Sequence, residues 1–164
     1  MARTETGYNI GLMYTDLYLQ AEAASNKKKD ALLLELQSHN DNLKDVAKLV
    51  SALTEKKASG KADFSHSPEF KDLIDRIWEK NKDPETNQSV IPSHQYCWKD
   101  ENSIDIALQG LNDRVKILGQ EANNVTMYIQ QEYHDMNAIT DSAKKFLEMI
   151  NETIRTIQSR TGRA

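Results

Sequence analysis

A long apolar repeat in the second half of the chain constrains its fold more than any other feature. Between Ser103 and Arg160, apolar residues recur at alternating steps of four and three residues, the heptad pattern of a left-handed coiled coil. The repeat, in which only Glu132 and Thr153 are polar, runs through Ile104, Leu108, Leu111, Val115, Leu118, Ala122, Val125, Ile129, Glu132, Met136, Ile139, Ala143, Phe146, Ile150, Thr153 and Ile157. No proline interrupts it, so the stretch predicts one helix roughly 85 Å long at about 1.5 Å per residue. Such a helix cannot bury its own apolar positions and needs a partner.

A second stretch of similar length can supply that partner. Residues Tyr8 to about Lys57 predict another helix, whose first part carries Ile10, Met13, Tyr14, Leu17, Tyr18, Ala21 and Ala24 at helical spacing. Its second part carries Leu32, Leu36, His39, Leu43, Val46, Val50 and Leu53. Between these two parts, at Lys27–Lys29, the spacing of the apolar residues is lengthened by one helical turn. Such an insertion predicts a stutter, where a coiled coil locally unwinds. The two helices predict an all-α fold, a long antiparallel coiled-coil hairpin with a small inserted head region. We expect His39 to fix the register of the pair, and whether it meets Glu132 stays open.

The segment between the two predicted helices has its own pattern. Gly60 predicts a left-handed helix cap, and Ser67-Pro68 predicts the start of a short helix that ends near Asn81. Its apolar positions are Phe70, Leu73, Ile74, Ile77 and Trp78. The turn-rich remainder predicts a short strand at Ser89–Ile91. The expected division is a flexible N-terminus (1–7), an N-terminal coiled-coil helix (8–58), a head (59–102) and a C-terminal coiled-coil helix (103–164).

Composition and motifs argue against several function classes. A net charge of −4 gives no basis for binding nucleic acid. There is no apolar run long enough to cross a bilayer and no secretory signal pattern, so we expect no membrane insertion. His94 and Cys97 are metal-ligand types, but no second pair lies at zinc-like spacing, so we predict a structural loop without a metal. No phosphate-binding loop or GxSxG motif is present, and we predict a non-catalytic chain without a cofactor.

Further apolar residues lie off the two heptad repeats. These are Met127, Tyr128, Tyr133, Leu147, Met149 and Ile154 in the second helix, and Leu33, Leu34 and Leu49 in the first. A two-helix hairpin cannot cover all of them. Either some contact another copy of the chain, or they form the wide stripe of a three- or four-helix bundle with the short helix packed across them.

The layout of two coiled-coil helices flanking a short head, on an acidic chain, resembles a known family. It is similar to the filament and needle-tip proteins of bacterial type III secretion systems, of the EspA and SseB type. Three short stretches add to this resemblance: Ala122-Asn123-Asn124-Val125-Thr126, Ile129-Gln130-Gln131 and Arg155-Thr156-Ile157. The head is shorter than in that family, and the N-terminal helix is less apolar.

The resemblance implies a secreted structural protein that reaches the bacterial surface by a signal-peptide-independent route. It implies self-assembly into a hollow helical filament on the secretion needle, with translocator proteins and a dedicated cytoplasmic chaperone as further partners. The candidate assembly residues are Leu32, Leu36, Leu43, Val46, Val50, Leu53, Ile104, Leu108, Leu111, Val115, Leu118, Val125, Ile129, Met136, Ile139, Phe146, Ile150, Ile154 and Ile157. One alternative is a needle-tip cap that forms a small ring and contacts partners through Trp78, Tyr96 and Trp98. Another is a cytosolic helical chaperone or adaptor.

Overall fold

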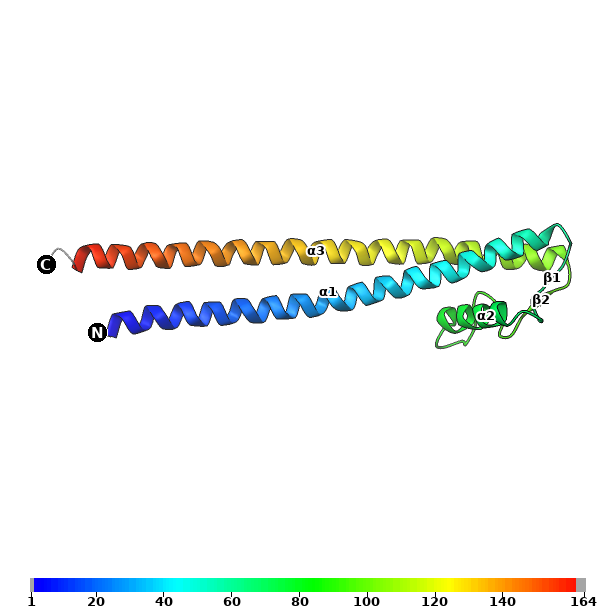
Figure 1. Cartoon of the computed structure of the whole chain (residues 1–164), viewed down its shortest axis with the longest axis horizontal. Coiled ribbons are helices and arrows are strands. Elements are labelled where there is room, and N and C mark those ends of the chain that lie inside the picture. The colour runs from blue at the N-terminus through cyan, green and yellow to red at the C-terminus, as the bar shows by residue number, and fades with distance from the viewer. Residues whose placement is uncertain (1, 162–164) are drawn as a thin grey trace. The chain divides into compact units, whose positions relative to one another are not determined.

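A computed structural model describes the backbone of residues 2–161 and the side chains of residues 12–159. These residues form three helices, α1 (Ala2–Lys57), α2 (Pro68–Asn81) and α3 (Glu101–Thr161), and two short strands, β1 (Ala62–Asp63) and β2 (Cys97–Trp98) (Figure 1). The predicted all-α hairpin with a small inserted head is confirmed, because α1 and α3 pack against each other. Contacts divide the chain into unit 1 (Met1–Leu33 with Met127–Ala164) and unit 2 (Leu34–Thr126).

The helix ends differ slightly from those predicted. α1 begins at Ala2, so the segment over 1–7 that we expected to be loose is helical from residue 2 onward. The helix ends at Lys57, as predicted, and Gly60 adopts the left-handed conformation (φ 70°) expected of the cap. α3 begins at Glu101, slightly before the expected start at Ser103. The side chains of Tyr8 and Ile10, assigned to the first helix, lie outside the described residues.

α2 forms where Ser67 and Pro68 open a short amphipathic sequence. Ser67 occupies the N-cap position with an extended backbone, and Pro68 starts the helix, where its missing N–H needs no partner. The helix ends at Asn81, which confirms the predicted short helix. Its buried residues are Leu73, Ile74 and Ile77. They join one core with residues of α1 and α3, so unit 2 is a three-helix arrangement.

This core of unit 2 contains many large, fully buried side chains. Its fully buried large side chains are Val46, Leu49, Leu53, Leu73, Ile74, Ile77, Ile91, Trp98, Ile104, Leu111 and Leu118. Each such side chain contributes about 1.5–3 kcal/mol relative to leaving it exposed. The core therefore gives unit 2 an internal source of stability.

Ion pairs and amides hold α2 against the long helices. Asp45 on α1 lies 3.2 Å from the Arg76 guanidinium and 3.1 Å from the Lys80 ammonium, both on α2. Asn81 exchanges two 2.9 Å hydrogen bonds with Asn42, which is almost fully buried. These contacts orient α2, because buried amides are costly unless they are paired.

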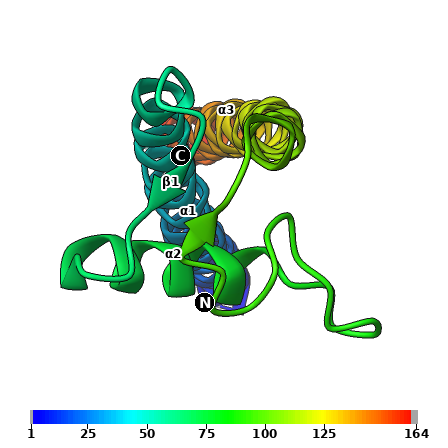
Figure 2. The ribbon, with the colours of Figure 1, turned by 90° about the vertical axis from the view of Figure 1, so that its right-hand side faces the viewer.

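The two strands form a minimal antiparallel pair. Ala62 lies opposite Trp98 and Asp63 opposite Cys97. Figure 2 shows β1 leading from α1 towards α2, and β2 leading back towards α3. The strand predicted at Ser89–Ile91 is wrong. Ile91 in that segment is buried in the core without belonging to a strand.

In unit 1, α1 and α3 run antiparallel. The rings of Tyr14 and Phe146 stack with their centroids 4.0 Å apart. The hydroxyls of Tyr18 and Thr140 lie 3.4 Å apart. As the number of the α1 residue rises, that of its α3 partner falls, which defines the antiparallel register.

His39 and Glu132 do not pair, which settles the question the sequence left open. In unit 2, His39 Nδ1 lies 3.3 Å from Glu121 Oε2 on α3. In unit 1, Glu132 is buried, accepts a 3.4 Å hydrogen bond from Ser25 and forms an ion pair with Lys28. Each polar position thus has its own partner across the α1–α3 interface.

In the first half of α1, Tyr14, Tyr18 and Ala21 are half-buried as predicted, but Met13, Leu17 and Ala24 are exposed. Met13 and Leu17 are 63% and 54% exposed, whereas their neighbours Tyr14 and Tyr18 are half-buried. The half-buried positions continue through Ala21, Ser25, Lys29 and Leu32. Two successive four-residue steps, from Ala21 to Lys29, fall where the sequence predicted the stutter.

Candidate functional site

The predicted assembly residues of unit 2 pack within the chain. Those fully or almost fully buried are Val46, Leu53, Ile104, Leu111, Leu118 and Val125. Those half-buried are Leu36, Leu43, Val50, Leu108 and Val115. Intrachain contacts with α1, α2 and α3 already satisfy most of them. Most of them belong to the core of unit 2 or pack against it, and another copy of the chain has little access to them.

The corresponding residues of unit 1 are much less covered. Leu32, Ile129, Met136, Phe146 and Ile150 are only half-buried. Ile139, Ile154 and Ile157 are 37%, 46% and 52% exposed. Among the described side chains of unit 1, only Glu132 and Ala143 are classed as buried, and neither is a large apolar residue. Within residues 12–33 and 127–159, the α1–α3 pair therefore has no core of large buried side chains.

Unit 1 also carries most of the exposed apolar surface of the described chain. Its exposed large apolar residues are Leu12, Met13, Leu17, Leu19, Leu33, Met127, Tyr128, Tyr133, Ile139, Leu147, Met149, Ile154 and Ile157. Unit 2 exposes only Leu34, Ile106 and Ile117 among its described side chains. Monomeric proteins rarely expose contiguous apolar patches above a few hundred Å², and larger ones mark interaction sites. We therefore take the apolar surface of unit 1 as the candidate site.

Leu49 explains why the two units differ. The sequence placed it off the heptad repeat and left open whether another copy or the short helix would cover it. In unit 2 it is fully buried in the core that α2 completes, so there the three-helix alternative is correct. Among the described residues of unit 1 there is no third helix to do the same for its off-repeat apolar residues.

The three proposed head contacts have different environments. Trp98 is only 2% exposed and packs edge-on against Phe64, so it is a core residue and is removed from the candidate contacts. Trp78 is half-buried, with the Lys82 ammonium 4.9 Å from its ring centre. The indole of Trp98 was misjudged because an aromatic residue beside a polar loop looks the same in sequence whether it points inward or outward.

Tyr96, the third proposed contact, ties its loop to α2. Its hydroxyl donates to the Asp75 carboxylate at 2.9 Å and accepts a 2.8 Å hydrogen bond from His94 Nδ1. Burial and the hydrogen bond to Asp75 raise the pKa of the Tyr96 phenol above its ordinary value, so it stays protonated as a donor. His94 has a positive φ of 55°, and these contacts help to hold that uncommon conformation.

The predicted loop pair His94 and Cys97 is not brought into a larger ligand group. Cys97 is exposed and unbonded to another cysteine. In residues 12–159, no three His, Cys, Asp or Glu side chains gather as a metal site. The His94 ring instead contacts Asp75 and Tyr96.

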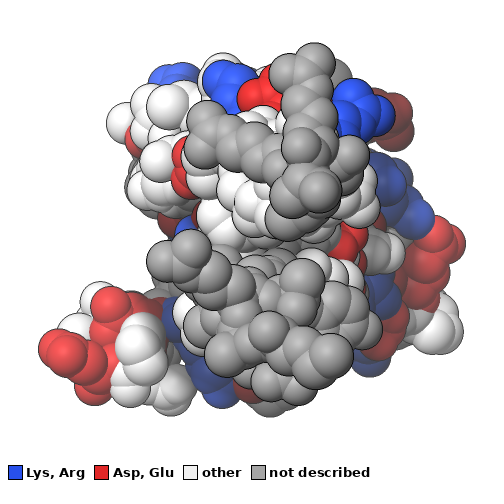
Figure 3. All heavy atoms as spheres, turned by 90° about the vertical axis from the view of Figure 1, so that its left-hand side faces the viewer, with Lys and Arg blue, Asp and Glu red and all other residues white. Residues whose placement is uncertain are grey.

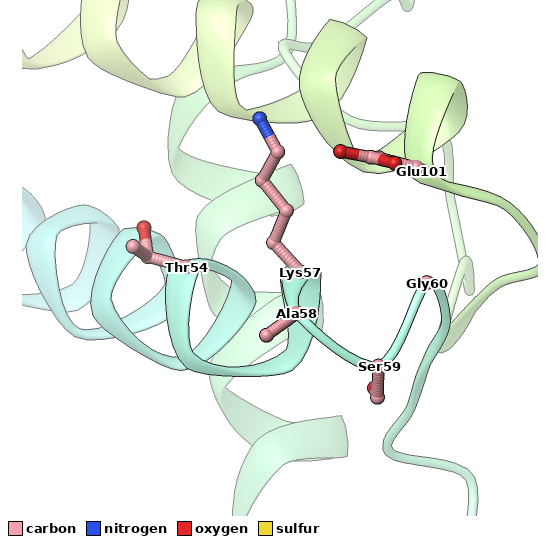
Figure 4. A pocket seen from close by; sticks show the side chains of 6 residues that line it. All are labelled: Thr54, Lys57, Ala58, Ser59, Gly60 and Glu101. Atoms are coloured by element: carbon pink, nitrogen blue, oxygen red, sulfur yellow. The ribbon is translucent and has the colours of Figure 1, made fainter.

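The charged surface and the depression at the end of α1 are weaker candidates for a binding site. Figure 3 shows Lys and Arg side chains interspersed with Asp and Glu over the face that it draws. At the end of α1, a shallow depression is lined by Thr54, Lys57, Ala58, Ser59, Gly60 and Glu101 (Figure 4). Lys57 extends towards α3, where it pairs with Asp105 at 2.6 Å, and the hydrogen bond to this carboxylate raises the pKa of the Lys57 ammonium. This lysine is therefore already engaged within the chain.

Comparisons with protein-family models, curated proteins and solved structures returned no match to this chain. Across residues 2–161, none of the helices has a segment both apolar and long enough to cross a membrane. The apolar surface of unit 1 is thus the feature from which a function is inferred.

Proposed function

We propose that this chain is a secreted structural protein that self-assembles through unit 1 into a helical filament. The observation that carries the proposal is the contrast between the units: unit 2 has a closed core, whereas unit 1 exposes most of its large apolar side chains. Burying a large apolar side chain is favourable by about 1.5–3 kcal/mol. Association of unit 1 with other copies would recover that free energy.

The resemblance to type III secretion filament and needle-tip proteins supplies the setting of the proposal. In that setting the filament extends the secretion needle and conducts exported proteins, and translocators and the needle are its further partners. A dedicated cytoplasmic chaperone would cover unit 1 before export, since an exposed apolar surface invites premature assembly. No catalytic role, cofactor or nucleic acid is part of the proposal.

Negative-stain electron microscopy over a concentration series, with light scattering in parallel, tests the proposal. We expect uniform filaments above a threshold concentration. A closed ring of fixed size would favour the needle-tip alternative. A monomer at every concentration would contradict self-assembly and favour the chaperone or adaptor alternative, and an export assay would then be decisive because a chaperone stays inside the cell.

A truncation provides a second test. Removing residues 149–164 deletes the last turns of α3, including Met149, Ile150 and Ile154. We expect a soluble monomer in which unit 2 stays folded. Both tryptophans, Trp78 and Trp98, belong to unit 2, so near-ultraviolet circular dichroism monitors that unit separately. Filaments formed by the truncated protein would contradict the assignment of assembly to unit 1.

A further inference from the structure

Five of the eight exposed large apolar residues that the structure describes on α3 in unit 1 form two separate rows. Tyr133, Leu147 and Ile154 are spaced by multiples of seven residues, so they occupy the same heptad position beside the repeat that faces α1. Tyr128 and Met149 are also separated by a multiple of seven and occupy the position on the other side of that repeat. All five are 46–57% exposed.

One contact with α1 shows which side of that helix accompanies the first row. The Lys29 ammonium lies 4.8 Å from the centre of the Tyr133 ring, so this side of α1 adjoins the first row. Leu33 is one turn from Lys29 on the same side. Leu19 follows the inward-facing Tyr18 by one residue, as Leu33 follows the half-buried Leu32, so both lie on this side although the stutter separates them. Leu12 lies seven residues before Leu19. Together they form the leucine flank: Leu12, Leu19, Leu33, Tyr133, Leu147 and Ile154.

The opposite side of α1 carries a different set. Leu17 precedes the inward-facing Tyr18 by one residue, whereas Leu19 follows it by one, so the two leucines lie on opposite sides of α1. Met13 is one turn from Leu17 and shares its side. This set forms the methionine flank: Met13, Leu17, Tyr128 and Met149. Its members are 54–63% exposed.

The size and position of the flanks favour a second copy of the chain as the occupant. Ten half-exposed large side chains offer on the order of 1,000 Å², which is near the lower limit for a specific interface. Unit 2 contains a comparable case. Leu49 precedes the inward-facing Val50 by one residue, just as Leu17 precedes Tyr18, and Leu49 is buried in the core to which α2 contributes. An amphipathic helix pair from another copy can cover the methionine flank in the same manner.

We propose that the leucine flank of one copy docks on the methionine flank of the next. Methionine side chains are flexible and pack favourably against aromatic rings, so Met13 and Met149 suit the ring of Tyr133 and the branched leucines. Because the two flanks differ and lie on opposite sides of the helix pair, each copy contacts two neighbours. Such heterologous contacts build open polymers when the rotation does not close. This inference rests on the proposed self-assembly and specifies its interface.

Two variants of the full chain separate the flanks. Leu19→Glu/Leu147→Glu disables the leucine flank, and Leu17→Glu/Met149→Glu disables the methionine flank. All four positions are about half-exposed, so neither variant buries a charge within the monomer. The control is Ile106→Glu/Ile117→Glu, which alters two exposed apolar residues of α3 in unit 2. Far-ultraviolet circular dichroism checks folding, and glutamine versions replace any glutamate variant that loses helix.

Sedimentation velocity is measured on each variant alone and on an equal mixture, at a concentration where the wild type assembles. We expect each flank variant alone to be a monomer and the mixture to contain dimers but no larger species. The control should assemble like the wild type. Dimers of a single flank variant, or a mixture that stays monomeric, would overturn docking of one flank on the other. Unchanged assembly of both variants would overturn the interface while leaving the proposed function intact. A wild-type monomer would instead overturn the proposed function itself.

Discussion

At the scale of single residues, Leu49 and Leu34 show how one helix uses the same side chain in two ways. Both are leucines of α1 in unit 2. Leu49 is fully buried in the core that α2 completes, whereas Leu34 is 68% exposed. Their contributions to folding should therefore differ sharply, although their chemistry is identical.

We expect Leu49→Ala to lower the free energy of unfolding by about 2–5 kcal/mol, because it removes buried methyl groups and leaves a cavity. Leu34→Ala is the matched control and should change stability by about 0.5 kcal/mol or less. Urea denaturation followed by tryptophan fluorescence reports unit 2 for both variants. Equal effects of the two substitutions would contradict the placement of α2 over Leu49.

Asp45 is the residue at which stability should depend on pH. Burial raises the pKa of this carboxyl, but hydrogen bonds from Arg76 and Lys80 and their positive charges lower it by more, so its pKa lies below the ordinary value. The resulting stabilisation is present above the unfolded-state pKa of about 3.9 and is lost as pH falls through the folded-state pKa.

We expect Asp45→Asn to destabilise unit 2 by about 1 kcal/mol or less at pH 7, because Arg76 and Lys80 are partly exposed to solvent. The difference from the wild type should shrink when the pH falls below about 4. Urea denaturation of both proteins at pH 7 and pH 3 measures this difference in the free energy of unfolding. A difference that grows on acidification would contradict the proposed role of the ion pairs.

At the scale of elements, the sequence predicted α2 and α3 well because both have strong local signals. Ser67-Pro68 and the apolar spacing that follows specify α2, and the unbroken heptad repeat specifies α3. The inward face of early α1 was harder to predict, since Met13 and Leu17 are more apolar than the adjacent residues that face α3. Strands of two residues, such as β1 and β2, have no periodicity to detect, and their pairing joins residues far apart in the chain.

The candidate site could be predicted only in part. The off-repeat apolar residues of α3 were identified from the sequence. The burial of Leu49 depends on where α2 packs, and the exposure of Leu17 depends on which face of α1 meets α3. Packing between elements distant in sequence is a tertiary property, which local patterns do not contain. The same holds for Trp98, whose burial follows from its contact with Phe64.

Glu132 allows a test of the α1–α3 pairing within unit 1. A polar residue on a coiled-coil seam specifies register at a cost in stability. We expect Glu132→Leu to raise the free energy of unfolding of unit 1 by about 1 kcal/mol, because it replaces a buried carboxylate, whose partner Lys28 is largely exposed, by apolar packing. Glu132→Gln should instead destabilise it, since a polar group stays buried without its charge partner. Thermal melting at a concentration below assembly distinguishes them, and a leucine variant less stable than the wild type would argue against the seam position of Glu132.

At the scale of the whole molecule, we infer that the two units have different sources of stability. Unit 2 is stabilised by its own three-helix core. Unit 1 leaves large apolar side chains exposed on both flanks of its helix pair, and we infer that contacts with other copies stabilise it. Local opening free energies should therefore differ between the units in the monomer and converge on assembly.

Hydrogen–deuterium exchange at two protein concentrations tests this claim most directly. In dilute monomer we expect amides of residues 12–33 and 127–159 to exchange much faster than those of the unit 2 core. Above the assembly threshold, the same two segments should become protected, while exchange in the unit 2 core stays unchanged. Equal protection of both units in the dilute monomer, or no gain of protection in unit 1 on assembly, would contradict the account.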